Sequence, residues 1–310
     1  MKSNCLFLIL AVVMGVFPPM APLAAQTVTD QLGRKVELPD DPQRVVALAP
    51  SITEIIFALG QAHLLKGVTQ FSDFPPAAEK LPQVGSYVRL DLEKIVALKP
   101  DLCIAIKDGN PREAVQRLES LKIPVYVVDP RGLDSVMQTI QEIGGLLHAG
   151  ARAASLIEDM QSRILRVKSL IAKTDLRPRV FFQIGIAPIV SVGSDTFIHE
   201  LIVLAGGKNL AEGSASYPRF SREQVMGLAP EIFIITTMER SALFDKVKAE
   251  WSRWPNLPAV QNDRIFLVDS NLFDRPSPRL ADALELLAQL IHPEIFEPET
   301  FKHPTTEEKR

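Results

Sequence analysis

The sequence of 310 residues has only two cysteines and five histidines, and it contains no run of basic residues. Cys5 lies close to the first residue, so Cys103 is the one cysteine in the rest of the chain and an internal disulfide is excluded there. Cys103 falls in an apolar stretch typical of a strand, which predicts a buried and inert thiol. Without a basic run, nucleic acid is not an expected partner.

Catalytic and metal-binding signatures are absent as well. The chain has no G-x-S-x-G, H-E-x-x-H, C-x-x-C, G-x-G-x-x-G or Walker-type phosphate loop. Its histidines are scattered, without the local spacing that marks many zinc sites. We therefore expect no catalytic residue, no metal site and no cofactor, a pattern that favours binding over catalysis. A secreted α/β enzyme with an unrecognised site is the more distant alternative.

Long apolar runs are also missing, apart from a short one near the first residue. Lys2 is followed by an apolar run over residues 5–17 and then by small residues that end at Ala25. The run is shorter than the ~20 residues that cross a bilayer, and the pattern is typical of a signal peptide. We expect residues 1–25 to be removed near Ala25 and the mature protein to be periplasmic. An uncleaved membrane anchor is the alternative.

What the chain does have is an internal repeat. Residues 92–105 return as residues 222–235, at a constant offset and with identical Glu, Leu, Pro and Ile positions. Each copy reads as a short helix, a proline that stops it, an acidic residue and a buried strand. One repetition over so long a period is not a solenoid. It predicts two similar lobes, with a cleft between them.

The order of elements predicts the fold class. Strands are expected at 44–49, 66–69, 101–106 and 124–128, and again at 179–185, 231–236 and 264–268, with helical stretches between them. Alternating strands and helices indicate α/β lobes, each a mainly parallel sheet flanked by helices. We expect caps at Ser51–Glu54 for the first helix, Ser194–Asp195 for a middle helix and Ser277–Pro278 for the last helix.

Residues 148–173 read as one long helix, because apolar residues recur at helical spacing and neither Gly nor Pro interrupts residues 151–176. The predicted organisation is therefore a signal peptide at 1–25, an N-terminal lobe at 26–147, an interlobe helix at 148–176, a C-terminal lobe at 177–292 and a flexible tail at 293–310. Because one rigid helix would connect the lobes, we expect little bending of one lobe relative to the other. The alternative is an ordinary long helix packed on one lobe.

Several loops that follow the expected strands are candidates for a ligand site. They include Pro50–Ser51, 70–75, 184–192 and 270–277, and two further loops place Tyr87 and Tyr217 just before the repeated helices. Ligands gather at the carboxyl ends of parallel strands. Aromatic side chains on such loops suit a flat and partly apolar ligand.

Glu93 and Glu223 occupy the same place in the two copies of the repeat. Each falls in the first turn of its helix, where the dipole favours a carboxylate and provides a sufficient local explanation. Their equivalence in two lobes also favours a second hypothesis, in which two negative groups dock onto a pseudo-symmetric permease.

Three of these segments, at 44–54, 71–75 and 92–101, resemble the periplasmic substrate-binding proteins of ABC importers. The subgroup is the one with a rigid interlobe helix, which serves cobalamin, haem and ferric siderophores. The resemblance runs over residues 28–292. Residues 182–186, 221–225 and 271–279 are most similar to its cobalamin-binding members. The resemblance implies capture of cobalamin in the interlobe cleft and delivery by a monomer to an ABC permease and ATPase complex through Glu93 and Glu223.

The resemblance also implies a set of cleft residues, which are Pro50, Ser51, Phe71, Tyr87, Ile184, Tyr217, Asn271, Phe273, Asp274 and Arg275. Phe71 stands where the cobalamin binders have Tyr, Tyr87 and Tyr217 stand where they have Trp, and Ile184 replaces an aromatic residue. Haem or a ferric siderophore is therefore the alternative ligand. A siderophore site is expected to offer cations to an anionic ligand, and the chief candidate is Arg275, with Arg89 and Arg219 as the further ones.

Overall fold

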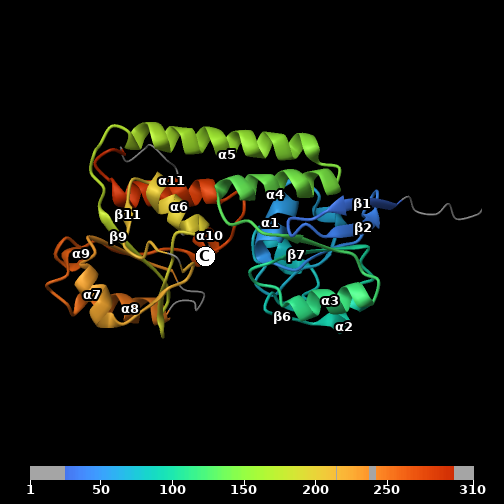
Figure 1. Ribbon diagram of the computed structural model, residues 1–310, viewed down its shortest axis with the longest axis horizontal. Helices are drawn as coiled ribbons and strands as arrows, with labels where there is room; N and C mark the ends of the chain where they lie inside the picture. Colours follow the sequence, from blue (N-terminus) through green and yellow to red (C-terminus); the bar gives the residue numbers. More distant parts are fainter. Residues whose placement is uncertain (1–24, 214, 237–241, 297–310) are drawn as a thin grey trace, which may run out of the picture.

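The computed structural model describes residues 25–213, 215–236 and 242–296, which form two α/β lobes joined by a long helix (Figure 1). The N-terminal lobe contains a four-stranded parallel sheet in the order β4-β3-β7-β8. These strands are β3 (Val45–Ala47), β4 (Leu65–Gly67), β7 (Leu102–Ile106) and β8 (Val125–Val128). The helices are α1 (Pro50–Ala58), α2 (Leu92–Ala97), α3 (Arg112–Ser120) and α4 (Leu133–Leu146). Two hairpins complete the lobe, β1–β2 (Ala25–Thr29, Lys35–Pro39) and β5–β6 (Gly85–Ser86, Arg89–Leu90).

The C-terminal lobe is built on a six-stranded mixed sheet in the order β12-β10-β9-β13-β14, with β11 also paired to β9. Its strands are β9 (Arg179–Gly185), β10 (Ile189–Ser191), β11 (Lys208–Asn209), β12 (Arg219–Phe220), β13 (Ile232–Ile235) and β14 (Ile265–Leu267). Its helices are α6 (Phe197–Leu204), α7 (Arg222–Leu228), α8 (Ala242–Ser252), α9 (Pro258–Gln261), α10 (Ser270–Phe273) and α11 (Leu280–Ile291). Only β10 runs antiparallel to its neighbours β9 and β12. The predicted fold class is confirmed.

The repeat seen in the sequence has a structural counterpart in how each lobe fixes its first central strand. Asp101 accepts hydrogen bonds from the backbone N–H groups of Gln43 and Arg44, at 2.8 and 2.9 Å, just before β3. Glu231 accepts one from the N–H of Arg179 at the start of β9, at 2.7 Å. The acidic residue that follows the helix-ending proline therefore has the same role in both lobes.

The helix α5 (Gly150–Ile171) is the connection between the lobes. It packs against α4 of the N-terminal lobe and against α6 and α11 of the C-terminal lobe. Buried residues of α5, such as Met160, Ile164 and Val167, belong to one apolar cluster that extends through both lobes. Because α5 contacts both lobes, the alternative of a helix packed on one lobe is wrong. The residue limits proposed for the lobes stay a prediction.

Three predicted helix starts differ from the structure. At α1 the N-cap is Ala49 and makes no side-chain cap, so the predicted capping box at Ser51–Glu54 is wrong. The cap of α6 is Thr196, whose hydroxyl accepts a hydrogen bond from the N–H of His199, one residue beyond the predicted pair. The last helix, α11, begins at Leu280 rather than at Ser277–Pro278. In the first and last cases, the polar side chain is used in a tertiary contact instead.

Cys103 lies in β7 and is fully buried, so the expectation of a buried thiol is confirmed. Burial raises the pKa of this thiol to about 12, which keeps it protonated and unreactive at neutral pH. Among the residues that the structure describes, no helix has the length and apolarity needed to cross a membrane. Apart from Ala25, which begins β1, the predicted signal peptide lies outside those residues, as does most of the predicted tail.

Candidate ligand-binding cleft

Two of the predicted aromatic residues, Phe71 and Tyr87, lie together. Their ring centroids are 6.2 Å apart in an edge-to-face arrangement, and Phe71 remains 38% exposed. A buried amide fixes the backbone at Tyr87, because Asn110 donates to the carbonyls of Tyr87 and Leu48, both at 2.8 Å. Asn110 was not predicted, and an isolated Asn after a strand gives no signal of such a role. The result is an exposed aromatic surface on a rigid support.

Tyr217 comes from the other lobe and is half exposed. Burial raises the pKa of Tyr217, and the nearby carboxylates of Asp108 and Asp274 raise it further. Burial and the charge of Asp274 raise the pKa of Tyr87 as well. One tyrosine from each lobe is therefore close enough to Asp274 to respond to its charge.

Asp274 is a half-buried carboxyl at the end of α10. Burial raises the pKa of Asp274 to about 7, with a smaller contribution from the carboxylate of Asp269. The hydroxyl of Thr236, which donates to Asp274 at 3.4 Å, opposes this rise, as does the charge of Arg275. Asp274 therefore changes its protonation state near neutral pH.

Arg275 is buried and paired with carboxylates, whereas we expected it to be the chief cation offered to an anionic ligand. Its side chain is 9% exposed and reaches across to the N-terminal lobe. The guanidinium lies 2.9 Å from both Glu54 and Asp73, and it donates to the carbonyl of Phe71 at 2.8 Å. Within its own lobe it donates to the amide oxygen of Asn271 at 2.6 Å. These contacts make Arg275 the centre of a buried bridge between the lobes.

Glu54 is the main acceptor of this bridge, although the sequence suggested only a capping role for it. Besides Arg275, it accepts a hydrogen bond from the hydroxyl of Ser277 at 2.6 Å, and Arg279 lies 3.5 Å away. Burial raises the pKa of Glu54, while Ser277 and the two arginines oppose the rise. Arg279 also lies over the ring of Phe74, 3.9 Å from its centroid. Residues 271–279 of one lobe are thereby tied to α1 and to residues 71–74 of the other.

Other predicted cleft residues have different surroundings. Phe273 is fully buried and packs on Phe182 at 5.7 Å between centroids, so its predicted place in the cleft is wrong. The reason is that α10 turns this side chain into the core. Pro50 and Ser51 are buried in the first turn of α1, and Ile184 is partly buried against the core at the carboxyl-terminal part of β9.

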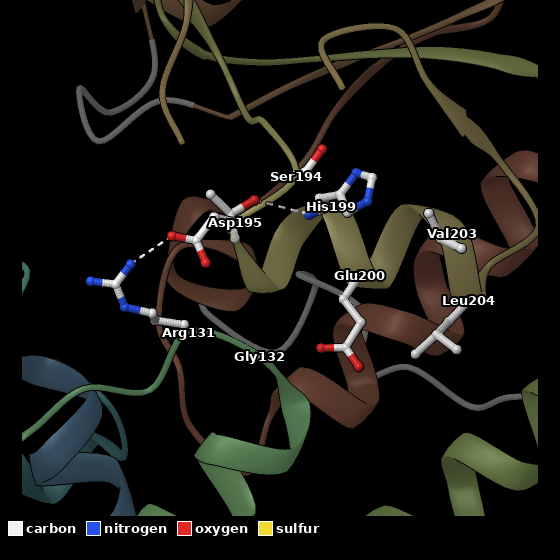
Figure 2. Close-up of a pocket in the computed structure, with 9 residues that line it drawn as sticks. Arg131, Gly132, Ser194, Asp195, His199, Glu200, Val203 and Leu204 are labelled. Carbon is white, nitrogen blue, oxygen red and sulfur yellow. Dashed lines mark hydrogen bonds and ion pairs between the residues drawn. The ribbon is translucent and has the colours of Figure 1, made fainter. Parts of the chain in front are cut away.

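A second bridge between the lobes is more exposed. Arg131, in the loop before α4, pairs with Asp195 of the C-terminal lobe at 2.6 Å, as Figure 2 shows. Glu200 of α6 accepts a hydrogen bond from the backbone N–H of Leu133 at 2.7 Å, and so caps the first turn of α4 from the other lobe. Asp129 lies 3.1 Å from Arg131 and 2.8 Å from Lys107. These two cations are thus already paired.

A pocket is located at this second bridge (Figure 2). It has a volume of about 380 Å³ and is lined by Arg131, Gly132, Ser194, Asp195, Thr196, His199, Glu200, Val203 and Leu204. None of the predicted cleft residues lines it. Its two walls come from different lobes, which is why no local sequence pattern could have identified it. Within the described residues, no cluster of His, Cys, Asp and Glu side chains is suited to hold a metal ion.

Glu93 and Glu223 are exposed in the first turns of α2 and α7. The caps of these helices are Asp91 and Ser221, whose side chains accept from the backbone N–H three residues later, at 3.1 and 3.2 Å. In Figure 1, α2 and α7 lie on the side of the molecule opposite α5, one on each lobe. The two glutamates therefore belong to equivalent, outward-facing helices.

Two α/β lobes joined by a shared helix, each with an exposed aromatic side chain, Phe71 on one lobe and Tyr217 on the other, define the architecture of the molecule. Residues 45–272 match the family described as periplasmic binding protein, and the chain belongs to that family. The family resemblance inferred from the sequence is confirmed. Its members are known as binding proteins rather than as enzymes.

The relatives include proteins for more than one ligand. The vitamin B12-binding protein of Vibrio parahaemolyticus is 31% identical over 244 residues, which are 78% of this chain and 86% of that protein. The structure of the periplasmic vitamin B12 binding protein of Vibrio cholerae has 29% identity and a TM-score of 0.72, over 83% of this chain and 99% of that one. A periplasmic heme binding protein from Pseudomonas aeruginosa has 27% identity and a TM-score of 0.75, over 81% and 93%.

Proposed function

We propose that this chain is the periplasmic component of an ABC importer, which captures cobalamin in the interlobe cleft and delivers it to a membrane permease. The observation that carries the proposal is that each lobe presents aromatic side chains to solvent, the Phe71 and Tyr87 pair on one lobe and Tyr217 on the other, and that the charge of Asp274 acts on both tyrosines. Cobalamin is a flat macrocycle edged by neutral amides, and aromatic rings give broad contact to such a ligand. The role includes no catalysis and no resident cofactor.

The charges around the cleft favour this ligand over an anionic chelate. Lys107, Arg131 and Arg275 each pair with a carboxylate of the protein. An anionic ferric siderophore would have to break such a pair to gain any of these three cations, which leaves the exposed Arg89 and Arg219 as its remaining candidates. Cobalamin makes no such demand, because its peripheral amides are neutral.

Haem is the second candidate, and the two tyrosines of the cleft are the reason. A tyrosine phenolate is one of the side chains that ligate haem iron. The raised pKa of both Tyr87 and Tyr217, which has burial as its largest cause, opposes formation of a phenolate. This ranks haem below cobalamin.

Calorimetric titration of the purified mature protein with cyanocobalamin, haemin and a ferric hydroxamate siderophore tests the ligand. One-to-one binding of cyanocobalamin alone supports the proposal. Binding of haemin or of the siderophore without cyanocobalamin overturns the ligand but keeps the binding role. Turnover of a bound ligand would contradict the proposal that the protein has no catalytic role.

Phe71→Ala is expected to weaken binding of cyanocobalamin by about 1–2 kcal/mol, or roughly 5- to 30-fold in Kd, because an exposed ring is lost from the contact surface. Leu165→Ala is the matched control. Leu165 is an exposed apolar residue of α5, outside the cleft, and its removal is expected to leave Kd unchanged. Equal Kd values for Phe71→Ala and the unaltered protein would remove Phe71 from the site.

The partner is proposed to be the permease and ATPase complex of the importer, docked through Glu93 and Glu223. Replacing both by Ala is expected to leave the Kd for cyanocobalamin unchanged and to reduce its uptake by cells roughly tenfold, because two interfacial charges are lost. The control variant replaces Glu113 and Glu212, one exposed glutamate in each lobe, by Ala. Cells with this variant are expected to take up cyanocobalamin normally. Normal uptake by the Glu93 and Glu223 variant contradicts docking through these residues.

The remaining features of the proposal concern the state of the mature protein. We propose export to the periplasm with cleavage near Ala25, a monomeric protein, and lobe limits at residues 26–147 and 177–292 around the interlobe helix. Mass spectrometry of the periplasmic protein tests the cleavage. An intact leader in that protein would contradict it.

A further inference from the structure

The repeat between the lobes extends to a pair of arginines that the docking hypothesis does not use. At the offset that relates Glu93 to Glu223, Tyr87 corresponds to Tyr217 and Arg89 corresponds to Arg219. In each lobe the arginine opens a short strand, β6 or β12, which leads directly into the helix with the glutamate. Both lobes thus carry an arginine and a glutamate four residues apart, in the same local structure.

Both arginines are exposed and, among the described residues, neither forms an ion pair, either with the glutamate four residues on or with any other carboxylate. Basic residues beside them do form such pairs. Lys94 lies 3.4 Å from Asp91, and Arg222 lies 2.9 Å from Glu250. Arg89 and Arg219 therefore retain guanidinium groups that are available to a partner.

Local helix stability does not explain these arginines. Each lies two residues ahead of an N-cap, Asp91 or Ser221, close to the positive end of the helix dipole. A cation there is unfavourable, whereas the carboxylates of Glu93 and Glu223 are favourable. The dipole is thus a sufficient reason for the glutamates but opposes the arginines. Because this positive charge is locally unfavourable and yet occurs in both lobes, we look for its role in contacts outside the helix.

We propose that the docking surface carries both signs of charge, with Arg89 and Glu93 on one lobe and Arg219 and Glu223 on the other. This inference rests on the proposed role as an importer component. The partner is a two-fold permease that presents, in each half, a cation to the glutamate and a carboxylate to the arginine. In Figure 1 both α2 and α7, which follow the arginines, lie on the side opposite α5. A surface with charges of both signs determines the relative orientation of the two proteins as well as their attraction.

The test measures association of the ligand-free protein with its cognate permease and ATPase complex in nanodiscs, by biolayer interferometry at low and physiological salt. The change of Arg89 and Arg219 to Ala is expected to weaken association about tenfold, as the loss of two exposed ion pairs implies. The change of both to Glu is expected to weaken it further, through repulsion. The matched control changes Arg112 and Arg253, one exposed arginine in each lobe, to Ala and leaves association unchanged.

The outcomes separate this inference from the proposed function. Unchanged association for the Arg89 and Arg219 variant, alongside weaker association for the Glu93 and Glu223 variant, overturns the arginine contacts and leaves docking in place. A higher Kd for cyanocobalamin in the arginine variant would place the arginines in the cleft and would also overturn the inference. If the unaltered protein does not associate with the complex at all, the importer role itself fails.

Discussion

Arg275→Met is expected to lower the free energy of unfolding by about 3–5 kcal/mol, because it removes the charge at the centre of a buried network while keeping a side chain of similar volume. The guanidinium is within 2.9 Å of Glu54 and Asp73, so its loss leaves two carboxylates without their main cation. Arg279, 3.5 Å from Glu54, compensates only in part. Urea unfolding of the purified protein, followed by circular dichroism, measures the change.

The exposed bridge between the lobes supplies the control for this prediction. Arg131→Met removes pairs with Asp195 and Asp129, in which the arginine is 39% exposed and the carboxylates are 56% and 17% exposed. Solvent screens such a pair, so the expected loss is below about 1 kcal/mol. If Arg275→Met cost no more than Arg131→Met, the buried network would not hold the lobes together.

Asp274→Asn is expected to remove a large pH dependence of stability. The pKa of Asp274 is raised by burial from 3.8 to about 7, so the folded protein holds this proton more tightly than the unfolded chain does. The contribution of protonated Asp274 to the free energy of unfolding is fully present below about pH 4, and it is lost as the pH rises through 7. The shift corresponds to on the order of 2–4 kcal/mol. At pH 8 the Asn variant is therefore expected to be more stable than the unaltered protein.

Urea unfolding at pH 5, 6, 7 and 8 measures this slope. Glu54, whose pKa burial also raises, contributes a slope of the same sign, so the difference between the two proteins isolates Asp274. Asp108→Asn is the control, because Asp108 is an exposed carboxyl near the same tyrosine. Identical slopes for Asp274→Asn and the unaltered protein would show that Asp274 is ionised throughout this range.

The two interlobe bridges bear on how the protein takes up its ligand. The Arg275 network is buried and lies beside Phe71, whose carbonyl it binds, so the aromatic surface is attached to the contact that joins the lobes. A shared apolar core along α5 adds to this rigidity. We therefore expect the proposed cleft to be largely formed before a ligand arrives, and a preformed site reduces the ordering cost of binding.

Errors in the sequence-based predictions occurred where a polar or aromatic residue had two possible environments. Glu54 has the spacing of a capping box, yet its carboxylate turns to Ser277 and Arg275 of the other lobe. Phe273 lies in a loop-like segment, yet α10 directs it into the core against Phe182. Local spacing indicates which contacts a residue can make. Which of these contacts forms depends on partners more than two hundred residues away, as in the pair of Glu54 and Arg275.

The sequence by itself determined the α/β class, the duplicated lobes, the long helix between them and the aromatic character of the cleft loops. These features follow from local periodicity, helix-ending prolines and an internal repeat, all of which are properties of neighbouring residues. Only the tertiary structure decided which charges the cleft retains. Arg275 and Arg131 are neutralised by carboxylates from the opposite lobe, whereas Asp274 is left half buried, where its charge acts on Tyr87 and Tyr217. Such pairings arise when two lobes pack together, because burial then makes an unpaired charge costly and selects its partner.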